Sequence, residues 1–243
     1  MIFEMGNGTI TGSMYEARLR ASLPRVEERI ARAAERSGRP GPVSIVAVTK
    51  GHPAGAASAA AAAGLRICGE NRVRELEEKR AAVEAALEWH LIGHLQRNKV
   101  RQALPLFELI HSVDSLRLAE TLSAEAVRAG VEVSALVQVN ASGEATKGGF
   151  DVRDGEDAVA QVAALPGIRV LGLMTMAPLT EDSAAVRSTF RSTRALFDRC
   201  AQSVSGFEAR HLSMGMSNDF EVAVEEGATM VRLGTVLFGE RER

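Results

Sequence analysis

The stretch SIVAVTKGHPAGAASAAAA, residues 44–62, places an apolar, β-branched run directly before a short turn and an alanine-rich segment. Because residues 45–48 show no alternation with polar residues, they predict a strand that is buried on both faces. Alanine is the best helix former, so the segment from Ala54 onward predicts a helix. Strand, turn and helix make one βα unit, and Lys50 is the polar residue at the end of its strand.

The same unit recurs along the whole chain. Strands that alternate with helices imply a parallel sheet that is covered by its crossover helices. Eight such units are what a closed barrel needs, whereas doubly wound sheets more often stop at five or six strands. We therefore predict the α/β class, as a single (β/α)8 TIM-type barrel without a second domain. The predicted strands are residues 44–49, 66–68, 89–92, 109–113, 133–139, 170–174, 209–212 and 230–233, and the predicted helices are 54–63, 72–87, 97–103, 115–129, 155–164, 183–203 and 218–226.

An extra N-terminal helix is predicted ahead of the first strand. From Tyr15 onward, apolar residues fall on one helical face, and Pro24 either kinks this helix or places its start at Ser22. No linker rich in Pro, Gly or Ser divides the chain. We expect residues 1–13 to be a flexible lead and residues 14–243 to form the barrel domain.

Composition limits the classes of partner and site. The chain of 243 residues is 46% hydrophobic and 25% charged, as expected for one globular barrel with a full core. A formal net charge of −2 and 4% aromatic residues give no reason to expect nucleic acid or a membrane as partner. Cys68 and Cys200 lack paired spacing, and His90 and His94 lie on a strand and turn, so no metal site is predicted. Two isolated thiols favour a reducing cytoplasm.

Functional-looking residues gather where the predicted strands end. In (β/α)8 barrels this carboxyl end of the strands carries the active site, although loops are polar for general reasons too. The residues at these positions are Lys50, Glu70, Asn71, Gly93, His94, Asp114, Asn140, Thr175, Met176, residues 213–217, Gly234 and Thr235.

Three of these positions suggest chemistry. A partly desolvated lysine such as Lys50 can lose its proton and attack a carbonyl, although a lysine at a rim can also simply reach solvent. The Gly- and Ser-rich loops after the last two strands are where this fold binds phosphate, with ordinary turn chemistry plus a helix N-cap at Ser217 or Asn218 as the alternative. Arg232, inside an apolar strand, needs an acceptor, either a ring nitrogen of a ligand or a carboxylate such as Glu225 or Glu226.

Taken together, several motifs resemble the pyridoxal phosphate homeostasis protein family. The chain resembles that family from about residue 14 to its C-terminal residue. The matching stretches are Val46-Ala47-Val48-Thr49-Lys50, Gly69-Glu70-Asn71, Trp89-His90-Leu91-Ile92-Gly93, His111-Ser112-Val113-Asp114, Lys147-Gly148-Gly149-Phe150, Leu212-Ser213-Met214-Gly215-Met216-Ser217 and Val231-Arg232-Leu233-Gly234-Thr235. One departure is Gly51-His52-Pro53, where many members place a polar residue and a lysine before proline.

The resemblance implies a barrel similar to the N-terminal domain of alanine racemase, with pyridoxal 5′-phosphate (PLP) as cofactor. It implies that Lys50 forms the Schiff base with PLP and that Arg232 faces the pyridine nitrogen. Asn71 and Met214 would lie beside the ring. The phosphate would be held by Ser213, Ser217, Gly234 and Thr235, with backbone N–H groups nearby such as that of Gly215.

The resemblance also bears on activity. An arginine opposite the pyridine nitrogen disfavours protonation of the ring, which makes it a weak electron sink. The sequence offers only Tyr15 in the N-terminal helix, Cys68 within a predicted strand and Cys200 in a predicted helix as a second base of the racemase kind, which supports a two-base racemase poorly. The first hypothesis is therefore a non-catalytic carrier or buffer in PLP homeostasis, monomeric and cytoplasmic, that supplies PLP-dependent apo-enzymes.

Two other hypotheses stay open. A low-activity PLP-dependent racemase or decarboxylase could draw a proton from His94, His111 or Asp114. A Schiff-base aldolase could use Lys50 on a phosphorylated sugar without any cofactor. The roles of His52, His94 and Asp114 at the rim are not decided by the sequence.

Overall fold

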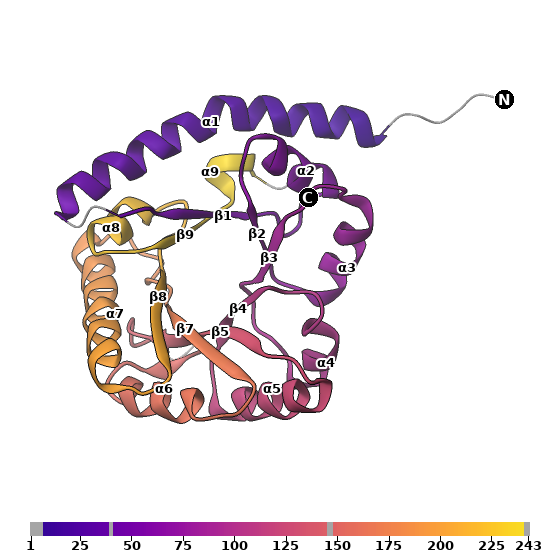
Figure 1. The fold of residues 1–243 in the computed structure, drawn as a ribbon. Helices are drawn as coiled ribbons and strands as arrows, with labels where there is room; N and C mark the ends of the chain where they lie inside the picture. The colour runs from indigo at the N-terminus through magenta and orange to yellow at the C-terminus, as the bar shows by residue number, and fades with distance from the viewer. Residues whose placement is uncertain (1–6, 39–40, 145–147, 241–243) are drawn as a thin grey trace.

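The computed structural model describes residues 7–38, 41–144 and 148–240, with side chains from residue 12 onward. Parallel strands close into a barrel (Figure 1), in the order β4-β3-β2-β1-β9-β8-β7-β5 with β4 paired to β5. A two-residue strand, β6, adds to the end of β5. The strands are β1 (Ser44–Val48), β2 (Ile67–Glu70), β3 (Glu88–Leu91), β4 (Leu109–Val113), β5 (Val133–Asn140), β6 (Phe150–Asp151), β7 (Ile168–Met174), β8 (Phe207–Ser213) and β9 (Met230–Leu233).

The helices form a ring outside the barrel, and α1 lies across one side of it (Figure 1). Within the described parts of the chain, none of the helices combines the length and the apolar character that crossing a bilayer demands. The helices are α1 (Asn7–Ser37), α2 (Ala54–Ala62), α3 (Val73–Ala82), η1 (Arg97–Lys99), α4 (Val100–Ala103), α5 (Leu116–Ala129), α6 (Gly155–Ala163), α7 (Ser183–Ser203), α8 (Phe220–Glu225) and α9 (Thr235–Phe238).

The predicted barrel is confirmed, since every predicted strand overlaps an observed one and the sheet closes. Helix α7 has the predicted bounds of residues 183–203, and its cap is Asp182, whose carboxylate accepts from two backbone N–H groups. The short elements β6 and α9 were not predicted. Each is too short to show a periodic pattern in the sequence.

The prediction for the N-terminal segment is partly wrong. Residues 7–13, expected within a flexible lead, belong to α1, and residues 1–6 lie outside the described chain. The helix also runs through Pro24 instead of beginning at Ser22. A helix whose later turns are packed against the barrel is already nucleated, so it can extend through glycines and one proline that would prevent an isolated helix from forming.

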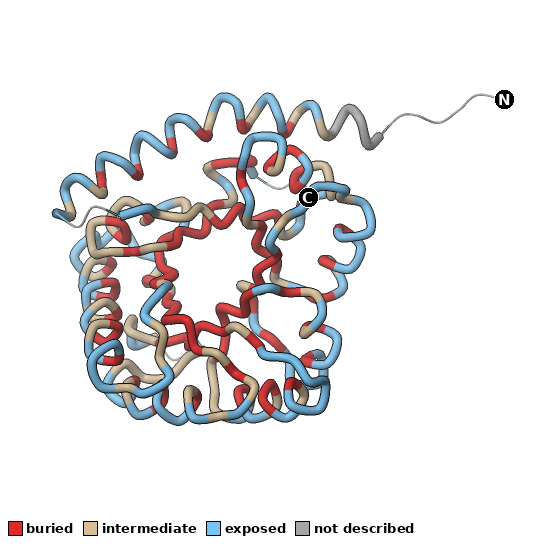
Figure 2. Tube along the Cα trace, viewed as in Figure 1, coloured by how far each residue is buried: buried red, intermediate tan, exposed pale blue. Residues whose placement is uncertain are grey.

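Two apolar clusters build the core. The larger one lies between the strands and the surrounding helices, and includes Trp89, Phe190 and Phe220. The smaller one is made by strand residues that face one another inside the barrel. Figure 2 shows the buried strand residues as a continuous inner ring. The members of the inner cluster are Val46, Leu109, Leu136, Leu171, Met174 and Met230.

Gly172 in β7 marks the tightest backbone approach in the wall. Its φ is +150°, and a Cβ at this position would lie 1.8 Å from the carbonyl oxygen of His211 in β8. The pairing of β7 with β8 shifts register between Val170 and Gly172, as a bulge does. Only glycine lets the two strands approach this closely.

Candidate functional site

The predicted site residues meet at the carboxyl end of neighbouring strands. β1 pairs with β2 on one side and with β9 on the other. Lys50, half-buried just past β1, therefore lies between Asn71, which follows β2, and Gly234, which follows β9. Gly93, in the loop after β3, packs directly against Asn71. A Cβ at position 93 would lie 2.8 Å from the Asn71 Cα, so the contact requires glycine.

Arg232 is buried inside the barrel, with 4% of its surface exposed. Its Nη1 donates to Ser213 Oγ at 2.7 Å, and its Nη2 donates to the carbonyl oxygen of Thr175 at 2.8 Å. Burial lowers the pKa of Arg232 to about 10, so the guanidinium keeps its charge at neutral pH.

The carboxylate alternative for Arg232 is wrong. Glu225 accepts from Arg36 and Arg187, and Glu226 accepts from Arg187 and Arg191, all on the outer surface of the molecule. A residue in α8 or just after it cannot turn toward the interior, because the wall formed by β8 and β9 lies between. The acceptors of Arg232 are instead a hydroxyl and a backbone carbonyl.

A chain of hydrogen bonds continues from Arg232 down the inside of the barrel. Ser213 Oγ lies 3.0 Å from His111 Nδ1, and His111 Nε2 lies 2.9 Å from His90 Nδ1. Burial lowers the pKa of His90 to about 3 and that of His111 well below its usual value, so both rings are neutral. Because Ser213 Oγ already accepts from Arg232, the contacts are satisfied when Ser213 donates to His111 and His111 donates to His90.

The hydrogen bonds that Ser213 makes in this structure differ from the phosphate contact that the resemblance implies. Its side chain is fully buried, and its hydroxyl bonds Arg232 and His111. The sequence did not indicate this pairing, because Ser213 and His111 are 102 positions apart. The only indication in the sequence was that alternate residues of a barrel strand point into the barrel.

The loops after β8 and β9 touch each other through Ser217. Its Oγ accepts from the backbone N–H groups of Gly234 at 3.4 Å and Val236 at 3.3 Å, both at the long end of the hydrogen-bond range. Gly215, with a φ of +94°, passes so close to α8 that a Cβ would lie 2.6 Å from the Cβ of Ala223. Thr235 begins α9 and is exposed.

The N-cap part of the alternative for these loops is wrong, because the N-cap of α8 is Asp219, and neither Ser217 nor Asn218 fills that position. Asp219 Oδ1 instead accepts from the backbone N–H of Met216 inside the loop. The Ser217 hydroxyl therefore serves the loop after β9 and not the start of α8.

Met214 lies away from the barrel interior. Its side chain is fully buried in the outer cluster, between the strands and the helices. Met174 and Met230 belong to the inner cluster, and Met176 packs against it. Met176, which follows β7, is thus the methionine at the carboxyl end of the barrel that contacts this cluster.

His94 and Asp114 form a pair on the rim. His94 Nδ1 lies 2.7 Å from Asp114 Oδ2, and the imidazole is mostly exposed. A groove of about 410 Å³ next to the pair is lined by His94, Asn71 and the cationic side chains of Arg72, Arg74 and Lys99. Among the described residues, no group of His, Cys, Asp or Glu side chains is arranged to hold a metal ion.

His52 connects the loop after β1 to the N-terminal helix. The Tyr15 hydroxyl lies 3.0 Å from His52 Nδ1, and both rings pack against Phe238 of α9. Arg18 also donates to the Phe238 carbonyl oxygen at 2.7 Å. Helix α1 therefore holds both the segment that follows Lys50 and the segment that follows Gly234.

Tyr15→Phe is expected to lower the free energy of unfolding by about 1 kcal/mol, since it removes one buried hydrogen bond and keeps the ring packing. Urea unfolding at an unchanged m-value measures the loss. Thr121→Val is the control, because the Thr121 hydroxyl bonds only within α5 on an exposed face. Equal stability of the Tyr15→Phe variant and the wild type would contradict the inferred link.

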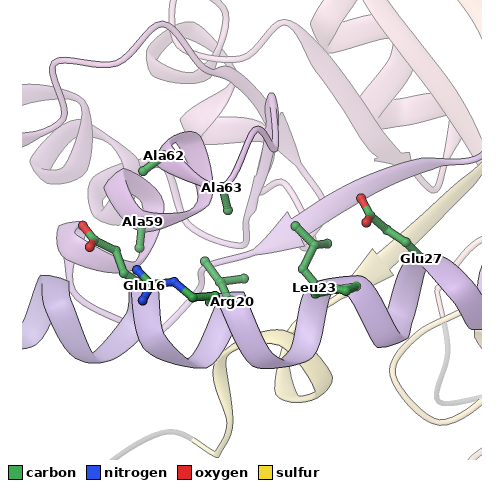
Figure 3. A pocket seen from close by; sticks show the side chains of 9 residues that line it. Glu16, Arg20, Leu23, Glu27, Ala59, Ala62 and Ala63 are labelled. Carbon is green, nitrogen blue, oxygen red and sulfur yellow. The ribbon is translucent and has the colours of Figure 1, made fainter.

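A groove of about 500 Å³ between α1 and α2 lies apart from these residues (Figure 3). Leu23 and Ala59 contribute apolar surface, and Glu16, Arg20 and Glu27 contribute charges. None of the predicted site residues lines it.

Comparison with known proteins decides the family. The sequence profile of the alanine racemase N-terminal domain matches residues 21–242. The pyridoxal phosphate homeostasis protein of Aquifex aeolicus is 42% identical over 90% of this chain and 97% of its own length. The chain belongs to the pyridoxal phosphate homeostasis protein family. The family prediction is thereby confirmed, and the protein of the same name from Pseudomonas aeruginosa is 40% identical over 91% of this chain and 95% of its own.

Solved structures agree with the family and with the fold. PipY of Synechococcus elongatus, solved with PLP bound, is 40% identical with a TM-score of 0.76, covering 85% of this chain and all of its own. A protein from Bifidobacterium adolescentis reaches a TM-score of 0.86 at 36% identity over 98% of both chains. Alanine racemase of Corynebacterium glutamicum, at 18% identity, shares the fold with a TM-score of 0.68 over 89% of this chain and 62% of its own.

Proposed function

We propose that this chain binds PLP as a Schiff base on Lys50 and acts as a non-catalytic carrier or buffer in PLP homeostasis. The observation that carries the proposal is the placement of a half-buried lysine and a buried, charged arginine at the same end of one barrel. The family to which the chain belongs is named for PLP homeostasis, and a relative has been solved with PLP bound.

The residues of this chain fit such a cofactor. A guanidinium has five N–H donors, and the contacts of Arg232 to Ser213 and Thr175 use two of them. Donors are left for an acceptor such as the pyridine nitrogen. The long contacts that Ser217 makes with the N–H groups of Gly234 and Val236 leave these groups able to bind a phosphate instead.

Bound PLP supplies an aldehyde that amines add to and a pyridine ring that accepts electron density. In this chain Arg232 stays charged at neutral pH and can only donate, so it keeps a proton off the ring nitrogen. Burial raises the pKa of Cys68 to about 12 and that of Cys200 to about 11, so neither thiol is a base at neutral pH. The hydroxyl of Tyr15 is bonded to His52. These environments favour holding the cofactor over turning over an amino acid.

We propose further that the protein acts as a monomer in the cytoplasm and passes PLP to PLP-dependent apo-enzymes. Both cysteines are free thiols, which suits a reducing compartment. The exposed rim with His94 gives an incoming amine access to the mouth of the barrel.

The test compares loading, turnover and transfer with the same purified protein. After incubation with PLP, the protein is expected to show a Schiff-base absorption band, to convert no common amino acid between its D and L forms, and to release no carbon dioxide. Mixed with a PLP-dependent apo-enzyme, it is expected to restore activity. Steady turnover above a free-PLP control would favour the weak racemase or decarboxylase. A protein that gains no band would favour the aldolase.

Ser217→Ala is expected to raise the Kd for PLP about tenfold or more, since it removes a hydroxyl that can bond a charged phosphate. Fluorescence or absorbance titration with PLP measures the change. Ser203→Ala, on the exposed end of α7 where the hydroxyl bonds Glu156, is the control. An unchanged Kd in Ser217→Ala would place the phosphate elsewhere.

A further inference from the structure

A buried cluster of charged residues lies on the outer side of the barrel wall, directly behind Lys50. Its centre is Lys79 of α3, which is 4% exposed. Lys79 Nζ donates to the carbonyl oxygen of Thr49 at 2.7 Å, to Glu70 Oε1 at 2.6 Å and to Glu75 Oε1 at 2.8 Å. An ammonium group has three N–H donors, so these contacts use all of them.

The cluster holds the chain on both sides of Lys50. Glu75 Oε1, besides accepting from Lys79, accepts from the backbone N–H of Gly51 at 2.5 Å. The backbone carbonyl of Thr49, just before Lys50, therefore accepts from Lys79, and the backbone N–H of Gly51, just after it, donates to Glu75. Lys79 and Glu75 are also hydrogen-bonded to each other. Both partners come from α3, so this helix fixes the segment that carries the reactive lysine.

The segment itself is a tight turn that the sheet does not hold. Pairing of β1 with β2 ends near Thr49, whose N–H donates to Gly69 O at 3.2 Å. The His52 N–H then returns to Thr49 O at 3.0 Å, and Gly51 has a φ of +71°. A turn with a positive φ at its third residue is of type II, which places Lys50 at the second position. Beyond the strand, the bonds from α3 hold the backbone on both sides of Lys50, and Tyr15 of α1 holds His52 after it.

Stability alone does not account for this cluster. Glu70 is fully buried, and its Oε2 has no hydrogen-bond partner among the described residues. Burial raises the pKa of Glu70, which Lys79 opposes. A buried ion pair often stabilises a fold no more than apolar residues of the same volume do. A buried carboxylate oxygen without a hydrogen-bond partner adds a further cost in folding free energy. Apolar residues could supply neither the acceptor that Glu70 gives the buried Thr49 hydroxyl, nor the donor to Thr49 O and the acceptor for Gly51 N–H beside Lys50.

We infer that Lys79 and Glu75 are positioning residues for Lys50, and that they hold its turn so that the lysine amine meets the aldehyde of PLP. The inference rests on the proposed function. Their hydrogen bonds go to Thr49, Glu70 and Gly51, and not to a side chain that is proposed to contact PLP. Their loss should weaken formation of the covalent bond to Lys50 and leave binding of the ring and phosphate unchanged.

The test uses two probes and a matched pair of variants. PLP reports covalent and non-covalent binding together, whereas pyridoxamine 5′-phosphate has no aldehyde and reports only the non-covalent part. Glu75→Ala removes the acceptor for Gly51, and Glu75→Gln keeps a carbonyl oxygen there. We expect Glu75→Ala and Lys79→Met to raise the Kd for PLP about tenfold and to slow formation of the Schiff-base band, with an unchanged Kd for pyridoxamine 5′-phosphate. Glu75→Gln should restore most of the PLP affinity.

Lys99→Met, which removes a solvent-exposed lysine, is the control for loss of a positive charge. Equal weakening of both probes, or no weakening of either in Glu75→Ala, would overturn the inference. Glu75 is only half-buried, so its variants decide the question even if Lys79→Met does not fold. Failure of the wild type to form the band would instead overturn the proposed function.

Discussion

Lys50→Ala is expected to abolish the Schiff-base absorption band of the PLP-loaded protein and the pyridoxyl adduct that borohydride fixes on the chain. No other described lysine can take its place. Lys79 is buried, with all three donors engaged on the outer side of the wall. Lys99 lies on η1, where it is exposed and bonds Gln102. Borohydride reduction followed by peptide mass mapping measures the adduct.

The matched control for this experiment is Lys99→Ala, which should keep both the band and the adduct on Lys50. The sequence contains four lysines, of which Lys147 lies outside the described residues. Digestion separates all four, so the adduct can be assigned to one of them. A pyridoxyl adduct on another lysine of the Lys50→Ala variant would show that Lys50 is not the residue that forms the Schiff base.

The fold was predictable because each strand carries its own signal. Residues 45–48 form an apolar β-branched run and Ala54 begins a strong helix former, so both halves of the first unit are visible in the sequence. The eight-fold recurrence then leaves the closed barrel as the architecture that uses every strand. Helix α1 was predicted less well, because its path through Pro24 depends on packing against α2 and α9, which no local pattern shows.

The site was predictable only where position in the barrel determines it. Lys50 and Gly234 end adjacent strands, so parallel pairing alone brings them together. The contacts of Ser213 with His111 and of Lys79 with Thr49 join residues 102 and 30 positions apart. Their geometry depends on strand register and on the rotation of α3 about its axis. Neither quantity is encoded in a spacing that can be read along one segment.

Acidification is expected to destabilise this protein steeply, because two histidines are buried without charge in the barrel. Burial lowers the pKa of His90 to about 3, and burial together with the neighbouring His90 and Arg232 holds the pKa of His111 well below its usual value. In the unfolded chain both rings titrate near pH 6.5. Below that pH the unfolded state binds protons that the folded state does not bind, so stability falls as the pH falls toward the folded pKa values.

The size of the expected loss in unfolding free energy follows from the number of histidines that are buried without charge. Each such histidine costs about 1.4 kcal/mol of unfolding free energy per pH unit below pH 6.5. For His90 and His111 together, the loss between pH 6.5 and pH 4.5 is about 5 kcal/mol, which is comparable to the whole stability of many domains. His211, whose pKa burial also lowers, adds to the loss. Glu70 opposes it, since a carboxyl with a raised pKa takes up its proton more readily in the folded state.

Urea unfolding at a series of pH values measures this dependence as a slope. His111→Gln, which keeps polar atoms in the ring's place, should remove about half of the slope between pH 6 and pH 4.5, whatever its stability at pH 7. Thr121→Val, which leaves every histidine in place, is the control and should keep the wild-type slope. A wild-type slope near zero would mean that the two rings accept protons inside the barrel. In that case the neutral hydrogen-bond chain from Arg232 through Ser213 to His90 would be wrong.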